Sequence, residues 1–349
     1  MSEKILEVRQ LATSFHTERG WQQAIDGVSF DVYQGEILGI VGESGCGKST
    51  LLKLLTGVLK AEKGHILVDG QEIKGVTEHF AYMPQNDLLF PWKTILENVC
   101  LYGRIHGSAD GMKEQAIKQM EAFGLKGYED EYPSSLSGGM RQRAAFLRTL
   151  LCHADILLLD EPFSAMDTYL REGLRLELSK VLADYDGVSV MVTHDRDEAF
   201  QLCKNIMLLD KGHVLIAGNS RKIFQDPVTC KAARLTGCKN ISKIERIGEY
   251  RVRALDWDNL EFVTDRPVGD DITAIGIRAH DFEPVKDPEG INHIPVGHAK
   301  ISEMPFEWYI TLQNGLWWKI GKAIHTHSAD GLIPEYVRVA PEAILLLKG

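Results

Sequence analysis

The sequence predicts an α/β domain followed by a small all-β domain, and three features of the chain support this prediction. A β-rich run at residues 36–41 leads through a glycine-rich turn into an apolar stretch with helical spacing. The runs ADILLLD and VSVMVTHD are short, continuously apolar and separated by a helical segment, which is typical of parallel strands buried on both faces of a sheet. Past about Cys238, short β-rich runs alternate with turns of Gly, Pro, Asn and Asp, which indicates a separate β domain.

The individual elements follow from local patterns. From about residue 5 to 69, the runs ILEVRQL, AIDGVSFDV, EILGIVG and HILVDG predict a start dominated by short strands. Leucines at helical spacing in STLLKLLTGVL predict a helix after the glycine-rich turn, and charged and apolar positions recur at helical intervals over 110–128 and 165–185. The tail predicts strands in YRVRALDW, LEFVT, ITAIGIR, WYITLQN and YVRVAPEAILLL. A length of 349 residues suits two domains, which we place at 1–238 and 239–349.

Composition excludes several classes of function. The net charge of −10 argues against a general nucleic-acid-binding surface, because such surfaces need clustered Lys and Arg. The six cysteines show no CxxC spacing and are interpreted as reduced thiols. No apolar run approaches the length that spans a bilayer, and the first residues lack the apolar segment of a signal peptide, so we expect the chain to stay in the cytosol.

The stretch GESGCGKST, residues 42–50, fits the pattern G-x-x-x-x-G-K-[ST] and lies between a predicted strand and a predicted helix. Its glycines allow consecutive backbone N–H groups to point at one anion, and the helix adds its positive N-terminal end. Lys48 supplies a charge for the β- and γ-phosphates, and the Ser49 hydroxyl can bind Mg²⁺. The pattern therefore predicts binding of a nucleoside triphosphate.

Two further segments suit phosphate chemistry. ILLLDEP places Asp160 and Glu161 at the end of an apolar strand, where ligands of parallel sheets gather. We expect Asp160 to hold Mg²⁺ through water and Glu161 to act as general base on the attacking water. LSGGMRQR places a hydroxyl and bare backbone N–H groups before a helix, which suits either an anion site or a simple helix cap.

Together these motifs make the chain from about residue 5 to 238 resemble the nucleotide-binding subunits of ABC transporters. The resemblance implies a P-loop ABC ATPase cassette with a helical subdomain at about 86–160, followed by an accessory β domain of the OB or TOBE type. It implies that ATP and Mg²⁺ are the ligands. The residues that it assigns to nucleotide binding are Phe15, Gly42, Glu43, Ser44, Gly45, Cys46, Gly47, Lys48, Ser49, Thr50, Ser137, Gly138, Gly139 and Asp167.

The resemblance also assigns roles in hydrolysis. Glu161 is the catalytic carboxylate, His194 in VTHD the switch histidine and Gln85 the Q-loop glutamine, while Ser49, Gln85 and Asp160 are the Mg²⁺ ligands. Phe15 matches the aromatic residue that stacks on adenine, and residues 164–167 match the D-loop. The signature of one copy would face the γ-phosphate held by a second copy. Met140 replaces the glutamine found in many relatives, and hydrolysis is expected to survive this change.

The resemblance further predicts partners and a solute. LLFPWKTILENV after Gln85 would receive a helix of a transmembrane permease subunit, which places the chain at the cytoplasmic face of the membrane, and an extracytoplasmic solute-binding protein would be an indirect partner. IGIRAHDFEP in the tail is similar to a segment in the accessory β domain of oxyanion, sugar and polyamine importers. ARLTGCKNIS, at the start of the tail, lies where molybdate-type relatives begin that domain, so we favour molybdate, tungstate or sulfate. The cassette segments look closer to nitrate, sulfonate and taurine importers, and a soluble non-transport ABC ATPase is the alternative of another class. Ser302, His280, His325 and His327 could contribute to a regulatory anion site or be surface residues of a scaffold.

Overall fold

The computed structural model describes residues 3–18, 20–107, 109–164, 168–322 and 333–349. The chain divides into two compact units, residues 1–221 and 222–349, and the first unit contains every motif of the predicted ATPase. Within the described ranges, no helix is both long enough and apolar enough to cross a membrane.

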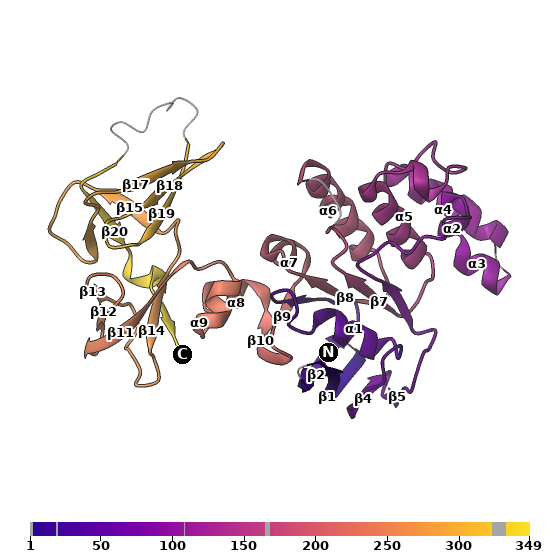
Figure 1. Ribbon diagram of the computed structural model, residues 1–349, viewed down its shortest axis with the longest axis horizontal. Coiled ribbons are helices and arrows are strands. Elements are labelled where there is room, and N and C mark those ends of the chain that lie inside the picture. The colour runs from indigo at the N-terminus through magenta and orange to yellow at the C-terminus, as the bar shows by residue number, and fades with distance from the viewer. Residues whose placement is uncertain (1–2, 19, 108, 165–167, 323–332) are drawn as a thin grey trace. The chain divides into compact units, whose positions relative to one another are not determined.

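A six-stranded sheet forms the centre of the first unit (Figure 1). Five neighbouring strands are parallel, and β10 is antiparallel to β9 at one edge. Every residue of β7 and β8 is buried, as expected for strands that are covered on both faces. In spatial order the strands are β10 (His213–Asn219), β9 (Asn205–Asp210), β3 (Ile37–Val41), β8 (Val188–Thr193), β7 (Ile156–Asp160) and β6 (Phe80–Met83).

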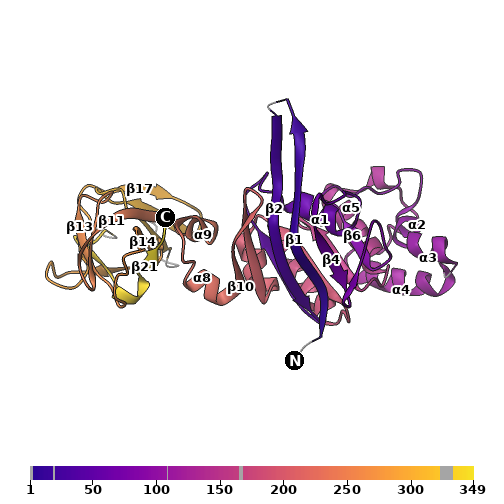
Figure 2. The same cartoon turned by 90° about the horizontal axis from the view of Figure 1, so that it is seen from below.

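A second, antiparallel sheet packs on the first through a shared core that also contains the leucines of helix α1 (Lys48–Leu55). Its strands, in spatial order, are β2 (Gly20–Tyr33), β1 (Lys4–Thr17), β4 (Lys63–Val68) and β5 (Gln71–Glu72). The predicted short strands at the start are wrong in length, because β1 and β2 each run for 14 residues. Their register shifts between Val8 and Thr13, and the polar continuation forms a two-stranded ribbon that extends beyond the sheet (Figure 2).

Besides α1, the helices that lie wholly within the first unit form two groups. Helices α6 (Thr168–Ala183) and α7 (Arg196–Leu202) follow β7 and β8 along the chain. The remaining helices lie together beside the sheet, at the end of the unit away from β10 (Figure 1), and they occupy most of the predicted helical segment. They are α2 (Ile95–Val99), α3 (Leu101–His106), α4 (Ala109–Ala122), the short 3₁₀ helix at Pro133–Ser135 and α5 (Gly138–Leu150).

The second unit begins within α8 (Ser220–Gln225), continues through α9 (Cys230–Leu235) and then consists of antiparallel sheets. Buried aromatic side chains, among them Trp257, Phe262 and Trp308, form its core. The five-stranded sheet has the order β13 (Leu260–Val263), β12 (Arg251–Ala254), β11 (Asn240–Gly248), β14 (Ala274–Ile277) and β21 (Leu345–Leu347).

Two three-stranded sheets complete the second unit. The predicted strand YVRVAPEAILLL is interrupted, because a 3₁₀ turn at Pro341–Ala343 separates β20 from β21. Several short strands of these sheets lack a clear alternation of polar and apolar residues and are not among the predicted ones. In spatial order the strands are β15 (Phe282–Val285), β20 (Tyr336–Val339) and β16 (His293–Pro295), and then β17 (Lys300–Glu303), β18 (Glu307–Thr311) and β19 (Trp317–Gly321).

Candidate active site

The glycine-rich loop between β3 and α1 packs so closely on neighbouring backbone that its glycines are required. A Cβ atom on Gly42 would lie 2.3 Å from the carbonyl oxygen of Leu209, and one on Gly47 would lie 2.4 Å from that of Ala24. Gly47 also has a φ of +109°, a conformation that L side chains rarely adopt. The loop therefore leaves its backbone bare at the start of α1, where N–H groups and the helix dipole favour an anion.

Lys48 is buried within this loop, with 5% of its surface exposed. Its Nζ donates hydrogen bonds to the carbonyl oxygens of Gly42, at 2.7 Å, and of Glu43, at 2.9 Å. The same nitrogen lies 4.0 Å from Oε1 of Glu161. A buried ammonium group held by neutral carbonyls and one carboxylate leaves positive charge available for the phosphates of a nucleotide.

Asp160, at the end of β7, is 2% exposed and accepts two hydrogen bonds from hydroxyl groups. Ser49 Oγ donates to its Oδ1 at 3.0 Å, and the Tyr82 hydroxyl donates to its Oδ2 at 3.2 Å. Burial raises the pKa of Asp160 above its usual range, although these two hydrogen bonds oppose that shift. Burial and the neighbouring carboxylate also raise the pKa of Tyr82. Tyr82 was not predicted from the sequence, because a tyrosine gives no local signal of its contact with a distant carboxylate, and no strand was predicted where β6 lies.

The side chain of Glu161 is the point where three loops meet. Its Oε2 accepts a hydrogen bond from Nε2 of Gln85 at 3.2 Å and lies 3.1 Å from Nδ1 of His194. Glu161 has a φ of +49°, which is uncommon for a residue with a side chain, and its backbone N–H donates to the carbonyl oxygen of Val192. Strain of this kind is often kept at functional sites, and here it accompanies the convergence of all three predicted catalytic side chains.

A cavity of about 650 Å³ lies in front of the loop. The signature residues Ser137, Gly138 and Gly139 are not among the described residues that line it, and Asp167 lies outside the described residues. The sequence motifs do not predict Gln22, Gln23, Ala24 and Lys211, which come from β2 and from the turn after β9. The lining comprises Phe15, Gln22, Gln23, Ala24, Ser44, Gly45, Gly47, Lys48, Ser49, Thr50, Gln85, Glu161 and Lys211.

The signature segment lies at the start of helix α5, and its residues do not line the cavity beside Lys48. Ser137 is the N-cap, and its hydroxyl oxygen accepts a hydrogen bond from the N–H of Met140 at 3.3 Å. Arg148, further along α5, donates to the carbonyl oxygens of Asp87 and Leu88, both at 2.8 Å. Helix α5 is therefore bonded to the chain that follows Gln85, so the signature and the Q-loop are mechanically linked within one copy.

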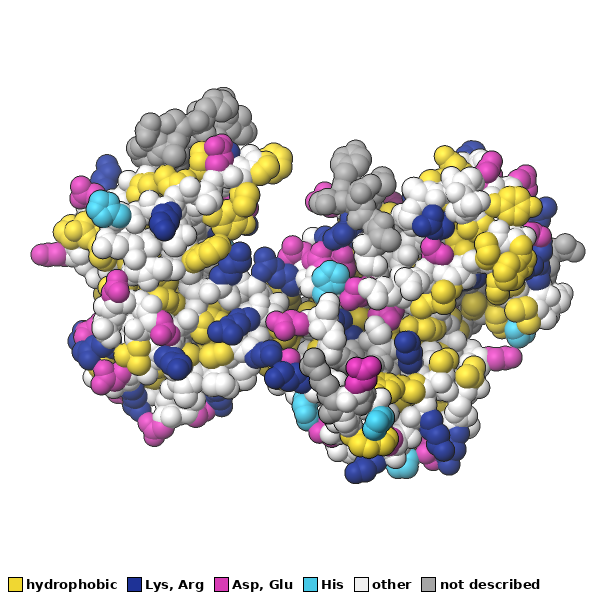
Figure 3. Space-filling model, in the orientation of Figure 1, with side chains coloured by type: hydrophobic (Ala, Val, Ile, Leu, Met, Phe, Trp, Pro, Cys, Tyr) yellow, Lys and Arg dark blue, Asp and Glu magenta, His cyan; other side chains and the backbone are white. Residues whose placement is uncertain are grey.

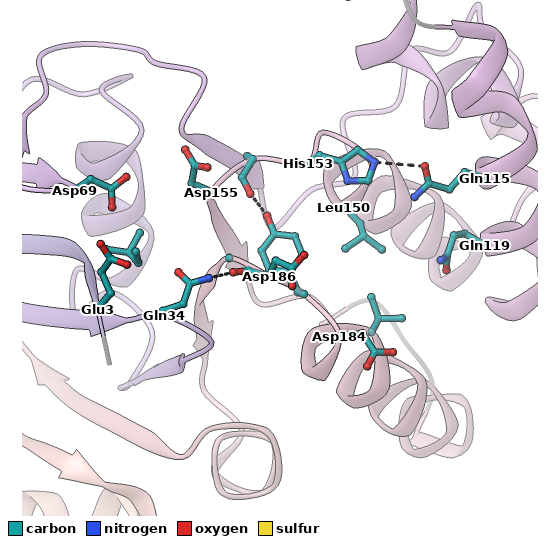
Figure 4. A pocket seen from close by; sticks show the side chains of 15 residues that line it. Glu3, Gln34, Asp69, Gln115, Gln119, Leu150, His153, Asp155, Asp184 and Asp186 are labelled. Atoms are coloured by element: carbon teal, nitrogen blue, oxygen red, sulfur yellow. Dashed lines mark hydrogen bonds between the residues drawn. The ribbon is translucent and has the colours of Figure 1, made fainter. Parts of the chain in front are cut away.

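A second cavity, of about 690 Å³, lies at the opposite ends of β7 and β8 (Figure 4). Its described lining contains carboxylates but no lysine or arginine, so it would repel a polyphosphate. His153 in this cavity lies 3.4 Å from Oε1 of Gln115. The two cavities are similar in volume but differ in the charge of their linings. The cavity beside Lys48 is therefore the candidate nucleotide site. The acidic side chains in the second cavity are Glu3, Asp69, Asp155, Asp184 and Asp186.

The other residues that the sequence suggested for reactivity or anion binding do not form a site among the described residues. The Cys46 side chain is buried, and burial raises the pKa of its thiol, which favours the unreactive protonated form. In the second unit, His280 is exposed beside Asp281, and Ser302 is exposed on β17, which gives neither an enclosed anion pocket. His325 and His327 lie outside the described residues.

The residues in front of the loop fit ATP and Mg²⁺. Bare backbone at Gly42 and Gly47 and the charge of Lys48 suit a polyphosphate, and Phe15, 39% exposed, offers a flat apolar surface to a base. Ser49 Oγ and Asp160 Oδ1 are oxygen ligands of the kind that Mg²⁺ prefers, and the remaining positions would be taken by phosphate and water. Bound Mg²⁺ would neutralise charge on the phosphates.

Comparisons with known proteins point to one family. The family model described as ABC transporter matches residues 25–164. The putrescine transport ATP-binding protein PotG of Escherichia coli K12 is 30% identical over 348 residues, which cover 96% of this chain and 84% of PotG. The probable sulfate/thiosulfate import ATP-binding protein CysA of Chlorella vulgaris is 35% identical over 221 residues, covering 62% of this chain and 94% of CysA.

A solved structure shares the fold. The ATP-binding cassette MJ0796, in a dimeric post-hydrolysis state bound to ADP and phosphate, has a TM-score of 0.56 at 24% identity and covers 62% of this chain and 99% of its own. The predicted P-loop cassette fold, followed by β-sheets, is thereby confirmed. With the relationship to PotG extending over nearly the whole chain, the protein belongs to the ABC transporter family as an ATP-binding subunit, an ATPase that uses Mg²⁺ and is coupled to transport.

Proposed function

We propose that this chain powers an ABC importer as a pair of identical copies that close on two molecules of ATP. The observation that carries the proposal is the division of the site. The described cavity contains Lys48, Ser49 and Glu161 but not Ser137, Gly138 or Gly139. A second copy in antiparallel orientation would supply the missing segment to the γ-phosphate held by Lys48.

The start of α5 is suited to that role. The helix has 13 residues, and Ser137 caps the N–H of Met140, so other N–H groups of the first turn stay available for an anion. Gly138 and Gly139 place no side chain between this backbone and a phosphate. Replacement of the usual glutamine by Met140 leaves these groups unchanged.

Within one copy, Glu161 is the proposed general base for the attacking water. Gln85 and His194 contact the same carboxylate oxygen and would orient it, while Lys48 lies beside the other oxygen. Glu161 takes a proton from the water, the water oxygen bonds to the γ-phosphorus, and ADP leaves. The γ-phosphate that bridges Lys48 of one copy and the signature segment of the other is then no longer joined to the nucleotide, so the two copies can part. His194 would contact both the γ-phosphate and Glu161, so that the position of Glu161 depends on an intact triphosphate.

The proposed permease contact lies on the segment between Gln85 and α2. Leu88 is 63% and Trp92 is 70% exposed, whereas Leu89 is buried and belongs to the core. Hydrophobic side chains gather on this face of the molecule over helices α2 to α5 (Figure 3). An exposed apolar face is suited to a helix of a transmembrane subunit, and this partner would hold the chain at the cytoplasmic face of the membrane.

For the solute, we propose an inorganic oxyanion such as molybdate, tungstate or sulfate, delivered by a solute-binding protein. The segment 233–242, which lies where molybdate-type relatives begin the accessory domain, supports it, and CysA, whose name includes sulfate/thiosulfate import, is a relative over the cassette. A polyamine is the second candidate, because PotG, named for putrescine transport, matches both units of the chain. Titrating the solute-binding protein that works with this importer with molybdate, tungstate, sulfate and putrescine tests both, and binding of putrescine alone would overturn the oxyanion proposal.

The pairing and the permease contact need a separate experiment. Light scattering of the Glu161→Gln variant with Mg-ATP should give twice the mass found without nucleotide, because the variant retains ATP and keeps the copies closed. Affinity purification of the intact chain from membranes should bring a multi-span protein with it, and Trp92→Ala should reduce that recovery. A variant that stays monomeric, or a chain that copurifies with no membrane protein, would contradict the proposal.

A further inference from the structure

The turn that joins β9 to β10 places a strained lysine in the wall of the nucleotide cavity. Lys211 has a φ of +47° and Gly212 a φ of +82°, while Asp210 and His213 pair across the turn. Two central residues with positive φ are the mark of a type I′ hairpin turn, whose first position favours Asn, Asp or Gly. A lysine in this left-handed conformation costs roughly 1 kcal/mol of stability. If the turn were the only requirement, Asn, Asp or Gly would form it with less strain.

Three backbone contacts fix the position of this turn. The N–H of Gly212 donates to the carbonyl oxygen of Cys46 in the phosphate loop at 2.9 Å. The carbonyl oxygen of Gly212 accepts from the N–H of Asp26 on β2, also at 2.9 Å. A Cβ atom on Gly212 would lie 2.6 Å from the carbonyl oxygen of Ala24. The Lys211 backbone is therefore held between the phosphate loop and β2, and its side chain lines the cavity between them.

The charges that line the cavity do not balance those of a nucleotide without this lysine. Among the described lining residues, Lys48 and Lys211 are the cations and Glu161 is the carboxylate. Lys48 is buried and already bonded to two carbonyl oxygens, whereas Lys211 is exposed. A nucleotide with several negative charges would be only partly neutralised by Lys48, and a second cation on a fixed turn strengthens its binding.

We propose that Lys211 binds the phosphate nearest the ribose, the part of the polyphosphate that ATP and ADP share. Of the lining residues, the hydrolytic groups Glu161 and Gln85 follow strands β7 and β6 of the parallel sheet, whereas Phe15 and Gln22 are paired on β1 and β2 of the other sheet. Lys211 is attached, through Gly212, to β2 and to the first half of the phosphate loop, so it lies on the side of the base. Lys48 serves the outer phosphates, and Lys211 serves the inner one.

The test measures displacement of a fluorescent ATP analogue from the full chain by ATP and by ADP. In Lys211→Asn, the Kd for both nucleotides should rise at least threefold and by the same factor, while Lys211→Arg should stay within twofold of the wild type. Because Asn is favoured in a type I′ turn, the thermal midpoint of Lys211→Asn without nucleotide should equal or exceed that of the wild type. The loss of affinity should shrink as salt is added.

The matched control is Lys60→Asn, which removes an exposed lysine outside the cavity lining and should leave both Kd values unchanged. A normal Kd for Lys211→Asn would overturn the proposal, and so would a loss confined to ATP, which would place the lysine at the γ-phosphate. Equal loss in Lys211→Arg would show that the turn, not the charge, matters. Normal binding by Lys48→Ala would instead remove the whole cavity from nucleotide binding, so the two failures are distinguishable.

Discussion

His194 Nδ1 lies 3.1 Å from Oε2 of Glu161, and this contact joins the ends of two neighbouring parallel strands. Gln85, two residues after β6, donates to the same oxygen. Three segments, at positions 85, 161 and 194, therefore meet at one carboxylate at the edge where β6, β7 and β8 end. This edge is where open parallel sheets bind their ligands.

The first prediction concerns Glu161. Replacing it with glutamine keeps the shape of the side chain but removes the base, so ATP turnover should fall by at least about 100-fold. The Kd for ATP should change little, because the phosphate loop and Lys48 are untouched. Phosphate release measures turnover, and fluorescent nucleotide titration measures binding. Asp155→Asn, in the acidic cavity, is the control and should hydrolyse ATP normally; unchanged turnover in Glu161→Gln would remove Glu161 from its role.

The second prediction uses the buried carboxyl of Asp160. Because burial raises its pKa in the folded state, Asp160 binds its proton more tightly when the protein is folded than when it is unfolded. The stability that this proton confers is complete below the ordinary pKa of an aspartate and is lost as the pH rises through the raised pKa. At neutral pH, the ionised Asp160 therefore lowers the stability of the protein without ligand.

Asp160→Asn should accordingly increase the free energy of unfolding at pH 7 by on the order of 1 kcal/mol. The gain should be smaller at pH 4 than at pH 7, because a carboxyl with a raised pKa takes up its proton as the pH falls. Urea unfolding at both pH values measures the difference, and Mg-ATP should stabilise the variant less than it stabilises the wild type. An Asn variant that is less stable than the wild type at pH 7 would contradict this prediction.

The third prediction concerns Phe15, which lines the nucleotide cavity from β1. If its ring stacks on adenine, Phe15→Ala should weaken ATP binding by about 1 kcal/mol, or about fivefold, and leave the affinity for inorganic triphosphate unchanged. Trp21→Ala is the control, because Trp21 pairs with His16 on the next register position and does not line the cavity. Equal loss for ATP and triphosphate would exclude stacking as the cause.

The sequence predicts the parts of this site that depend on local pattern. The phosphate loop, the Asp160–Glu161 pair and His194 each lie next to a short apolar strand, and the parallel sheet brings these strands together. Their order along the chain identifies the family, and with it Gln85. These residues can be predicted without knowledge of the tertiary packing, because the motif and its flanking strand define their position.

The residues that were missed depend on contacts between distant segments. Tyr82 reaches Asp160 across neighbouring strands, and Lys211 reaches the cavity because its turn is bonded to Cys46 and Asp26. Nor does polar sequence such as TSFHTERGWQQ predict a strand, yet pairing between β1 and β2 extends the hairpin through it. Tertiary contact, not local propensity, decides each of these cases.

The last prediction concerns the segment between Gln85 and α2, most of which has no regular secondary structure and which holds the exposed Trp92. Asn98 is fully buried beneath it. Its Oδ1 accepts from the N–H of Phe90 at 2.7 Å, and its Nδ2 donates to the carbonyl oxygens of Phe90, Lys93 and Thr94 at 3.0 to 3.2 Å. The carbonyl oxygens of Phe90 and Thr94 also accept from the N–H groups of Lys93 and Asn98, so the Asn98 side chain matters most for the Phe90 N–H and the Lys93 carbonyl oxygen.

Asn98→Ala should lower the free energy of unfolding by roughly 3 kcal/mol, because it removes the hydrogen-bond partner of the Phe90 N–H and of the Lys93 carbonyl oxygen and creates a cavity at a fully buried position. Amide exchange over residues 88–94 should accelerate, whereas the Kd for ATP should stay near the wild-type value. Thr94→Ala is the matched control: it removes the cap of α2, whose hydroxyl accepts from the N–H of Glu97, and should cost only about 1 kcal/mol. If both variants lose the same stability and leave the exchange of residues 88–93 unchanged, Asn98 does not hold this segment.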